Sequence, residues 1–174
     1  MRSLFAIASA VGIASASLAC GGSSSDGGTV TPPDGPFPNP LVVASGLTIK
    51  YFAKVPGARV MALGPDGAVY VSVPSANKVV RVWDTNGDNV ADSSRTAVSG
   101  LHGPAGLAFH KGYLYIANEN GVVRTQLDAH GNATESLVQV NTLPSGAGHA
   151  TRTIVFGADS AMYVSIGSSC NLCV

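Results

Sequence analysis

An internal repeat constrains the fold of this 174-residue chain more than any other feature of its sequence. Three segments align on a tyrosine, at Tyr70, Tyr115 and Tyr163, so the copies lie 45 and 48 residues apart. In each copy a short apolar stretch meets a tight turn, and a second stretch then follows with alternating apolar side chains. This pattern predicts three antiparallel β-hairpins of one type.

The halves that follow the first two hairpins also repeat. The stretch 78–83 recurs as 121–126, and each is followed by a turn and a last strand, at 95–99 and 137–142. Four strands in roughly 45 residues is the period of a β-propeller blade. Because these strands are apolar on both faces, both faces must be covered, as they are when blades stack around a channel. The sequence therefore predicts an all-β fold of β-propeller type.

The number of repeats is too small for a closed ring. A propeller closes with about four to eight blades, whereas this chain holds two full repeats, half of a third and one leading strand at 47–54. We therefore expect residues 41–174 to be the N-terminal, truncated part of a larger propeller, whose last blade the leading strand would complete. The alternative is a small domain that pairs its open blades with another chain.

The first forty residues carry signals for export rather than for folding. A short apolar run rich in Ala and Ser ends at Ala19-Cys20, which predicts a signal peptide of lipoprotein type over 1–19. Cys20 would then be lipidated, although Ser17 stands where Leu is usual; ordinary cleavage near Ala19 is the alternative. Gly, Ser and Pro dominate 20–40, as in a flexible tether. We expect a bacterial periplasmic or cell-envelope protein, held to the membrane only by a lipid anchor.

The charge of the chain excludes several classes of partner. Ten Lys and Arg balance ten Asp and Glu, so nothing favours nucleic acid or an anionic membrane surface as a ligand. With 45% hydrophobic and only 11% charged residues, the composition also argues against a disordered chain.

Candidate chemistry lies in the loops that enter the innermost strand of each blade, because these loops meet at the mouth of the channel. His102 and His149 both lie six residues before the aligned inner strands, and Arg59 and Arg152 both lie three residues before them. An imidazole suits a general base and a guanidinium suits an anion or a quinone oxygen. His149 is the candidate catalytic residue, with a hydrogen-bonded loop histidine as the alternative. His110 and His130 fall in turns and are expected to be solvated, and the spacings offer no zinc motif.

Residues 84–92 place carboxylate or amide oxygens at alternate positions, as calcium loops do. The loop lacks the expected glycine at Asn89 and has Arg95 where a bidentate glutamate belongs. Its sister loop at 128–135 keeps the length but loses most carboxylates. These departures favour a hairpin turn with solvated aspartates over a calcium site.

Cys170 and Cys173 form a CxxC pair at the end of the chain. The residue after the pair is Val174, which excludes haem attachment, and no further zinc ligands have suitable spacing. Export implies an oxidising compartment, so the two cysteines most simply form a disulfide with each other. A redox-active pair remains the alternative.

Three runs carry a resemblance to a known family. Together, 56–67, 100–109 and 148–173 resemble the sorbosone dehydrogenase branch of the soluble sugar dehydrogenases that use pyrroloquinoline quinone (PQQ), and the likeness spans about residues 47 to 174. It implies a six-bladed propeller with the quinone across the channel mouth. His149 matches the catalytic histidine, which takes the proton of the anomeric hydroxyl while hydride passes to the quinone. Arg152 would be a neighbour near the cofactor.

The chain departs from that family because it lacks the later blades, which supply most cofactor-binding arginines and the calcium ligands. We therefore expect a fragment of a PQQ-dependent dehydrogenase that oxidises the anomeric or aldehyde carbon of a sugar, and we expect it to be inactive by itself. Its partners would be a small sugar or aldehyde and an electron acceptor that the residues do not identify. The alternative is a non-enzymatic NHL-like propeller that binds a partner through the same mouth without a cofactor.

Overall fold

A computed structural model describes residues 4–6, 28–29, 44–146, 148–168 and 170. Apart from one short 3-10 turn at Pro74–Ala76, every regular element in these residues is a β-strand. None of the described residues form a helix long and apolar enough to cross a membrane. The all-β prediction is confirmed.

The first repeat forms one antiparallel sheet in which neighbouring strands follow chain order. Its four strands are β4 (Met61–Leu63), β5 (Val69–Val73), β6 (Lys78–Trp83) and β7 (Ser93–Val98). A short strand, β2 (Gly28–Thr29), pairs antiparallel with the outer side of β7. The final strand begins at residue 93 rather than at the expected residue 95, since Trp83 and Ser93 are register partners.

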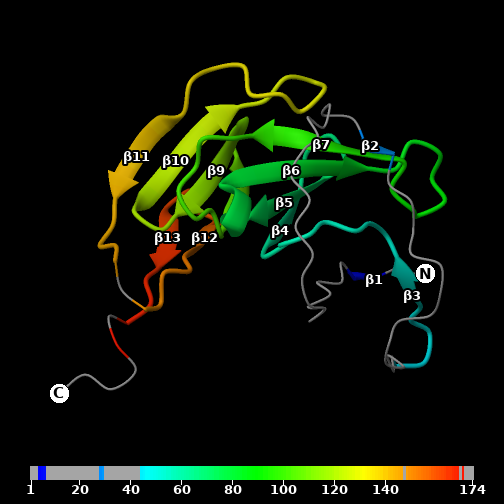
Figure 1. Cartoon of the computed structure of the whole chain (residues 1–174), viewed down its shortest axis with the longest axis horizontal. Coiled ribbons are helices and arrows are strands. Elements are labelled where there is room, and N and C mark those ends of the chain that lie inside the picture. The colour runs from blue at the N-terminus through cyan, green and yellow to red at the C-terminus, as the bar shows by residue number, and fades with distance from the viewer. Residues whose placement is uncertain (1–3, 7–27, 30–43, 147, 169, 171–174) are drawn as a thin grey trace, which may run out of the picture.

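The second repeat forms a four-stranded antiparallel sheet of the same order, and the third forms a hairpin. The second sheet contains β8 (Leu107–His110), β9 (Tyr113–Asn118), β10 (Gly121–Gln126) and β11 (Val138–Thr142). The hairpin contains β12 (Thr153–Phe156) and β13 (Met162–Ser165). The predicted two full blades and one half blade are thus present (Figure 1).

The blades lie side by side, with β8 in contact with both β4 and β12. One buried cluster fills the space between the first and second blades and includes Tyr70, Leu107 and Ile116. A second cluster, with Tyr115 and Ile154, lies between the second and third blades. Stacked sheets explain why both faces of these strands are apolar. This is the arrangement of propeller blades in an incomplete ring.

The leading strand is shorter than the expected 47–54, and its pairing with the last blade of a larger ring stays a prediction. β3 (Ile49–Tyr51) pairs in parallel with β1 (Leu4–Ala6) and with no strand of the third blade. The segment that follows packs Phe52, Ala53 and Val55 against the outer face of the first blade, where they join Val71 and Val80 in a third buried cluster. Here burial of apolar side chains, not strand pairing, fixes the segment.

One histidine prediction is wrong. His110 is half-buried at the end of β8, and its ring stacks on Phe156 with centroids 4.1 Å apart and planes 5° apart. The turn begins only at Lys111, so the last residue of the strand faces the third blade instead of solvent. His130 is exposed, as expected.

Candidate functional site at the channel mouth

Strand direction brings two kinds of loop to one end of the blades. The loop before an inner strand and the turn between the second and third strands of a blade lie at the same end of the sheet, because successive strands alternate in direction. Asn77, in the β5–β6 turn, accepts a hydrogen bond on Oδ1 from the amide of Gly103, 2.9 Å away. The carbonyl of Asn77 accepts another from Leu101 at 3.1 Å. The first blade therefore holds the loop that carries His102.

The turn after β9 links this loop to the next one. The amide of Glu119 donates to the carbonyl of His102 over 3.0 Å. The carboxylate of Glu119 accepts a hydrogen bond from the amide of Gly146 over 3.2 Å. The second and third mouth loops are thus joined through one residue, by its backbone amide on one side and its carboxylate on the other, and the structure brings the loops of His102 and His149 together as predicted.

His149 is exposed on the third mouth loop. Its carbonyl oxygen accepts a hydrogen bond of 2.7 Å from Nη1 of Arg152. On the other side its backbone lies against Gly167, just after β13: a Cβ added there would lie 2.6 Å from both Cβ and O of His149. An exposed imidazole on a backbone held at two points is suited to proton transfer with a ligand at the mouth.

Arg152 is 1% exposed, which is rare for an arginine. Its Nη2 donates to the carbonyl of Pro144 over 2.7 Å, in addition to the bond from Nη1 to His149. Its Nε has no hydrogen-bond partner in the described structure. A buried guanidinium needs polar contacts to offset its lost hydration, and here the carbonyls of His149 and Pro144 supply them, with that of Thr151 farther away at 3.4 Å. Arg152 therefore closes the loop that presents His149.

Gly106 provides the contact between the second and third inner strands. Its amide donates to the carbonyl of Arg152 over 2.8 Å. A Cβ added at Gly106 would lie 2.9 Å from backbone atoms of Arg152, Thr153 and Ile154, so only glycine fits there without a shift. The glycine allows the backbone of the second blade to approach the start of β12.

The remaining predicted mouth residues are exposed. Arg59 lies on the loop of the first blade, where its amide donates to the carbonyl of Ser72 over 2.9 Å. Nδ1 of His102 lies 3.9 Å from Oε2 of Glu119, and the two side chains are 62% and 25% exposed. At that distance and exposure the contact between His102 and Glu119 is weak.

Residues 84–92 form a turn in which the carboxylates of Asp84 and Asp92 accept hydrogen bonds from other residues of the same turn. Asp84 accepts backbone hydrogen bonds from Asn86, Gly87 and Asn89, at 3.0, 2.7 and 2.8 Å. Asp92 accepts from the amide and hydroxyl of Thr85, which lowers the pKa of the Asp92 carboxyl. Among the described residues there is no group of three or more His, Cys, Asp or Glu that could hold a metal. The geometry is that of the expected hairpin turn.

The cysteine predictions fall mostly outside the described residues. Cys170 is disulfide-bonded, whereas Cys173, its expected partner, and Cys20, the expected lipid site, are not among the described residues. The pairing of Cys170 with Cys173 and the lipid on Cys20 stay predictions.

Of three further residues at the mouth, Glu119 and Gly167 carry no signal that repeat alignment could detect, whereas Asn77 precedes the stretch 78–83 as Asn120 precedes 121–126. Asn77, Glu119 and Gly167 each touch a loop that is distant in sequence, by 26, 27 and 18 residues respectively. Asn77 has a left-handed backbone with φ of 51°, a conformation for which asparagine is enriched. Of these three residues, only Asn77 could have been recognised from the sequence as a special position in a turn.

Comparison with known proteins finds similar structures but no match by sequence. No protein-family model matches the chain, and no curated protein matches it. The Coprinopsis cinerea pyranose dehydrogenase PQQ domain in holo form is similar in structure, with a TM-score of 0.64 and 17% identity, over 75% of this chain and 33% of that chain. A Trichoderma reesei enzyme of Carbohydrate-Active Enzymes Family AA12 is similar with a TM-score of 0.55 and 23% identity, over 66% of this chain and 31% of that chain.

This chain spans about a third of the length of these two structures. At these identities the likeness establishes the fold: the three repeats are blades of a propeller of the kind found in a PQQ domain. Repeat counting and structural similarity therefore agree on the architecture.

Proposed function

We propose that this chain is part of a quinone-dependent oxidoreductase that acts on a sugar, with His149 as the general base at the channel mouth. The observation that carries the proposal is the exposed imidazole of His149 on a loop closed by buried Arg152, in blades similar to those of a PQQ domain. The resemblance of the sequence to sorbosone-type dehydrogenases points to the same chemistry. The proposed substrate is the anomeric or aldehyde carbon of a sugar.

The described residues fit such a quinone in part. PQQ, when bound, would accept a hydride from the substrate. His149 and Arg59 are exposed on mouth loops and supply a proton acceptor and a cation for an anionic or carbonyl group. Arg152, whose guanidinium donates to two loop carbonyls at 1% exposure, is proposed to support the site through the loop. A direct contact between Arg152 and a cofactor would require those bonds to open.

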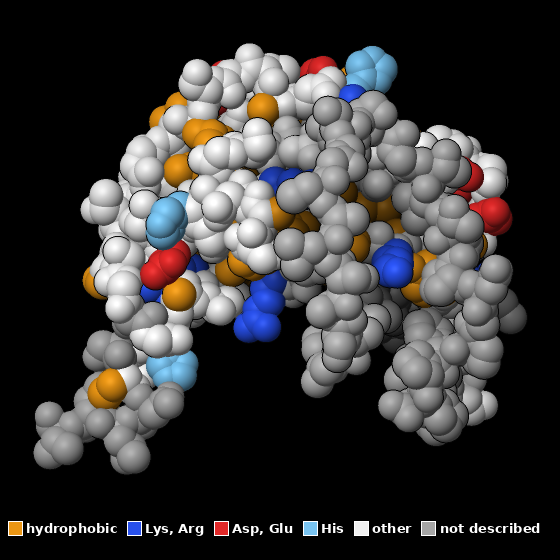
Figure 2. Space-filling view, viewed as in Figure 1, with side chains coloured by type: hydrophobic (Ala, Val, Ile, Leu, Met, Phe, Trp, Pro, Cys, Tyr) orange, Lys and Arg blue, Asp and Glu red, His pale blue; other side chains and the backbone are white. Residues whose placement is uncertain are grey.

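In this proposal the imidazole of His149 accepts the proton of the substrate hydroxyl. The hydrogen bonds of Arg152 to the carbonyls of His149 and Pro144 hold the backbone that carries the imidazole. Part of the entropy cost of positioning the imidazole is therefore met on folding and not during the reaction. Sparse charge on the face seen in Figure 2, where Lys, Arg, Asp and Glu are few and scattered, suits a small neutral substrate better than a polyanion. We further propose that the protein is exported to the bacterial envelope and anchored through Cys20.

The test uses the structural similarity directly. The part of the Coprinopsis PQQ domain that this chain matches is replaced by residues 44–168, and PQQ-dependent dye reduction is measured with a panel of aldoses. We expect a folded chimera that binds PQQ to turn over, and we expect His149→Ala to reduce kcat by a factor of about 10² to 10⁴. His102→Ala is the matched control and should leave kcat within a few fold.

Two results would contradict the proposal. One is a chimera that folds and binds PQQ but loses no activity with His149→Ala. The other is sugar oxidation by the 174-residue chain without added quinone, since this chain alone is expected to be inactive.

A further inference from the structure

The turn between the second and third strands of each complete blade holds the mouth loop of the next blade. In the first blade, Asn77 does so by itself: its carbonyl accepts the amide of Leu101 at 3.1 Å, and its Oδ1 accepts that of Gly103 at 2.9 Å. In the second blade, the carbonyl of Asn120 accepts the amide of Leu143 at 2.9 Å. Both asparagines directly precede the third strand of their blade, so the two turns are equivalent.

The mouth loop of the third blade is longer than that of the second blade. His102 directly follows Leu101, whereas residues 144–148 stand between Leu143 and His149. The backbone contact of Leu143 therefore lies farther along the chain from the histidine than the equivalent contact of Leu101 does. A second contact is needed to hold the added residues against the second blade.

Glu119 makes this second contact with only one of its two carboxylate oxygens. Its Oε1 accepts the amide of Gly146 at 3.2 Å. No hydrogen bond reaches Oε2 from the residues that the structure describes, and Nδ1 of His102 lies 3.9 Å from it, beyond hydrogen-bond distance. The side chain of Glu119 is 25% exposed. One oxygen of a partly desolvated carboxylate is thus without a donor at the channel mouth.

The negative charge of Glu119 is not needed to hold the loop. Asn77 shows that a neutral side-chain oxygen is enough to accept an amide of a mouth loop. A glutamine at position 119 would present the same acceptor to Gly146. Partial burial of a carboxylate costs hydration, and donors that reach both of its oxygens offset this cost. A donor that comes from a ligand would account for the charge and for the unused oxygen together.

The carboxylate of Glu119 lies beside the loop that presents His149. Two nitrogens of the Arg152 guanidinium donate to the carbonyls of Pro144 and His149, both at 2.7 Å, so a single side chain joins the start of the loop to the histidine. Gly146, which Glu119 holds, lies between these two anchors in the chain. The carboxylate and the imidazole thus belong to the same part of the mouth.

We propose that Glu119 determines sugar specificity: its Oε2 accepts a hydrogen bond from one hydroxyl group of the sugar, other than the hydroxyl that His149 deprotonates. This inference rests on the proposed function. A hydroxyl bound to a carboxylate makes a short, charge-assisted hydrogen bond. A site built for such a bond discriminates strongly against an analogue that lacks the hydroxyl. Glu119 is therefore a binding residue, and the proton transfer belongs to His149.

The binding test uses the 174-residue chain and ligands that lack the anomeric hydroxyl, so that the readout does not depend on turnover. Methyl glycosides of glucose, galactose, mannose and xylose are titrated, and the NMR chemical shift of the Gly146 amide reports their binding. Glu119→Gln should weaken binding of the tightest glycoside by about 10-fold or more, because the variant loses a hydrogen bond to a charged group. It keeps the acceptor for Gly146.

Monodeoxy analogues of the tightest glycoside then identify the hydroxyl. One analogue should bind the original chain as weakly as the parent glycoside binds Glu119→Gln, and it should lose nothing further in that variant. The other analogues should still lose about 10-fold. Glu135→Gln is the matched control, because Oε1 of Glu135 also accepts one backbone amide, that of Gln126 at 3.3 Å, at the opposite end of the second blade. It should leave every affinity unchanged.

The chimera with the Coprinopsis PQQ domain separates this inference from the proposed function. In the chimera, Glu119→Gln should lower kcat/KM mainly by raising KM, whereas His149→Ala should lower kcat. Activity that is insensitive to His149→Ala would contradict the proposed function alone, since the glycoside titration stands without turnover. Activity that depends on His149 but not on Glu119 would contradict the specificity role alone.

Three results of the titration would overturn the inference. The first is a Gly146 amide whose shift no glycoside changes. The second is an equal loss of affinity for the parent and for every deoxy analogue in Glu119→Gln, which would mean that the carboxylate contacts no particular hydroxyl. The third is a shift of the same amide by calcium alone that Glu119→Gln abolishes, which would assign Oε2 to a cation.

Discussion

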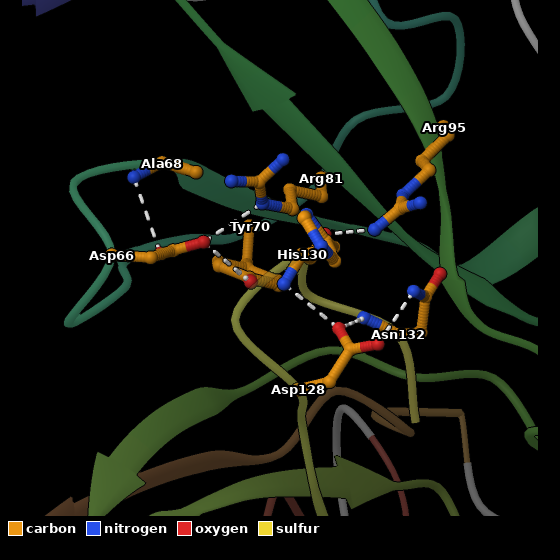
Figure 3. Close-up of polar contacts among 8 residues, drawn as sticks. All are labelled: Asp66, Ala68, Tyr70, Arg81, Arg95, Asp128, His130 and Asn132. Carbon is orange, nitrogen blue, oxygen red and sulfur yellow. Dashed lines mark hydrogen bonds and ion pairs between the residues drawn. The ribbon is translucent and has the colours of Figure 1, made fainter. Parts of the chain in front are cut away.

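Arg81 donates from Nε to Oδ2 of Asp66 over 2.8 Å, and this pair is covered by a glycine of the neighbouring blade. Gly131 lies against Arg81 and against Oη of Tyr70, in a loop that Asp128 holds together by accepting the amides of His130 and Asn132 at 2.9 and 2.8 Å (Figure 3). The cluster of Asp66, Tyr70 and Arg81 in the first blade is therefore also a contact between the first and second blades.

The first prediction concerns that contact. Gly131 has φ of 77°, and a Cβ there would lie 2.3 Å from Cδ of Arg81 and 2.5 Å from Oη of Tyr70. Gly131→Ala should lower the free energy of unfolding by about 2–4 kcal/mol, from backbone strain and overlap together. Gly87→Ala is the control, because Gly87 has φ of 80° and nothing within 4 Å; it should cost only about 1–2 kcal/mol. Equal losses in urea unfolding would mean that Gly131 does not join the blades.

Acid should weaken the same cluster. Although burial acts to raise the pKa of Asp66, hydrogen bonds from Arg81, Tyr70 and Ala68 outweigh it and hold that pKa below the ordinary 3.8. A carboxyl with a lowered pKa in the folded state stabilises the fold above its ordinary pKa, and this stabilisation is lost as pH falls through the folded pKa. In urea unfolding followed below pH 4, Asp66→Asn should therefore show a shallower decline than the original chain. Parallel declines would contradict this assignment.

Alkali should destabilise the folded state by ionising Tyr70. Burial, followed by the charge of Asp66, raises the pKa of Tyr70 from 10.0 to about 12. A raised pKa of an acid means that the folded state is favoured below pH 10 and that this contribution disappears as pH rises from 10 to about 12. Tyrosinate absorbance should show a phase near pH 12 that Tyr70→Phe removes. Burial also raises the pKa of Tyr51, so the titration of Tyr51 should remain in the variant. An absorbance curve that Tyr70→Phe leaves unchanged in shape would contradict the assignment.

Gly167 is predicted to position His149. A Cβ at Gly167 would lie 2.6 Å from the backbone oxygen and Cβ of His149, so Gly167→Ala must move the histidine. We expect a changed NMR chemical shift of the His149 imidazole and a changed rate of its modification by diethyl pyrocarbonate, with Tm lowered by a few degrees. In Gly112→Ala, in the β8–β9 turn, where a Cβ meets nothing within 4 Å, the imidazole signal should stay in place.

Arg152 is predicted to stabilise the mouth loop. Arg152→Met removes the donors to the carbonyls of His149 and Pro144 and leaves both without this partner. The loss should be about 2–4 kcal/mol in the free energy of unfolding, because the loop would lose the charge-assisted hydrogen bonds of a buried guanidinium. Arg59→Met, at an exposed position, should change it by less than about 0.5 kcal/mol. If the two variants unfold alike, the buried guanidinium does not hold the loop.

The sequence predicted the blades well because the strands of a blade pair with strands that are close to them in the chain. Alternating apolar residues and turns between them specify each hairpin within about ten residues, and Tyr70, Tyr115 and Tyr163 all lie on the second strand of their blades, as the alignment requires. The position of the mouth loops followed from the same strand order. His110 was misplaced because a one-residue difference in the end of a strand decides which way the side chain points.

What sequence alone determined, then, is the all-β repeat and the order of its strands, since period-two patterning acts between neighbours in the chain. Tertiary structure decided the rest. The guanidinium of Arg152 is buried and donates to the carbonyls of His149 and Pro144. Gly131 packs against Arg81, and Glu119 joins two mouth loops. Each of these contacts joins side chains to backbone that only packing brings close. No periodicity records such contacts, because they depend on the close approach of whole sheets.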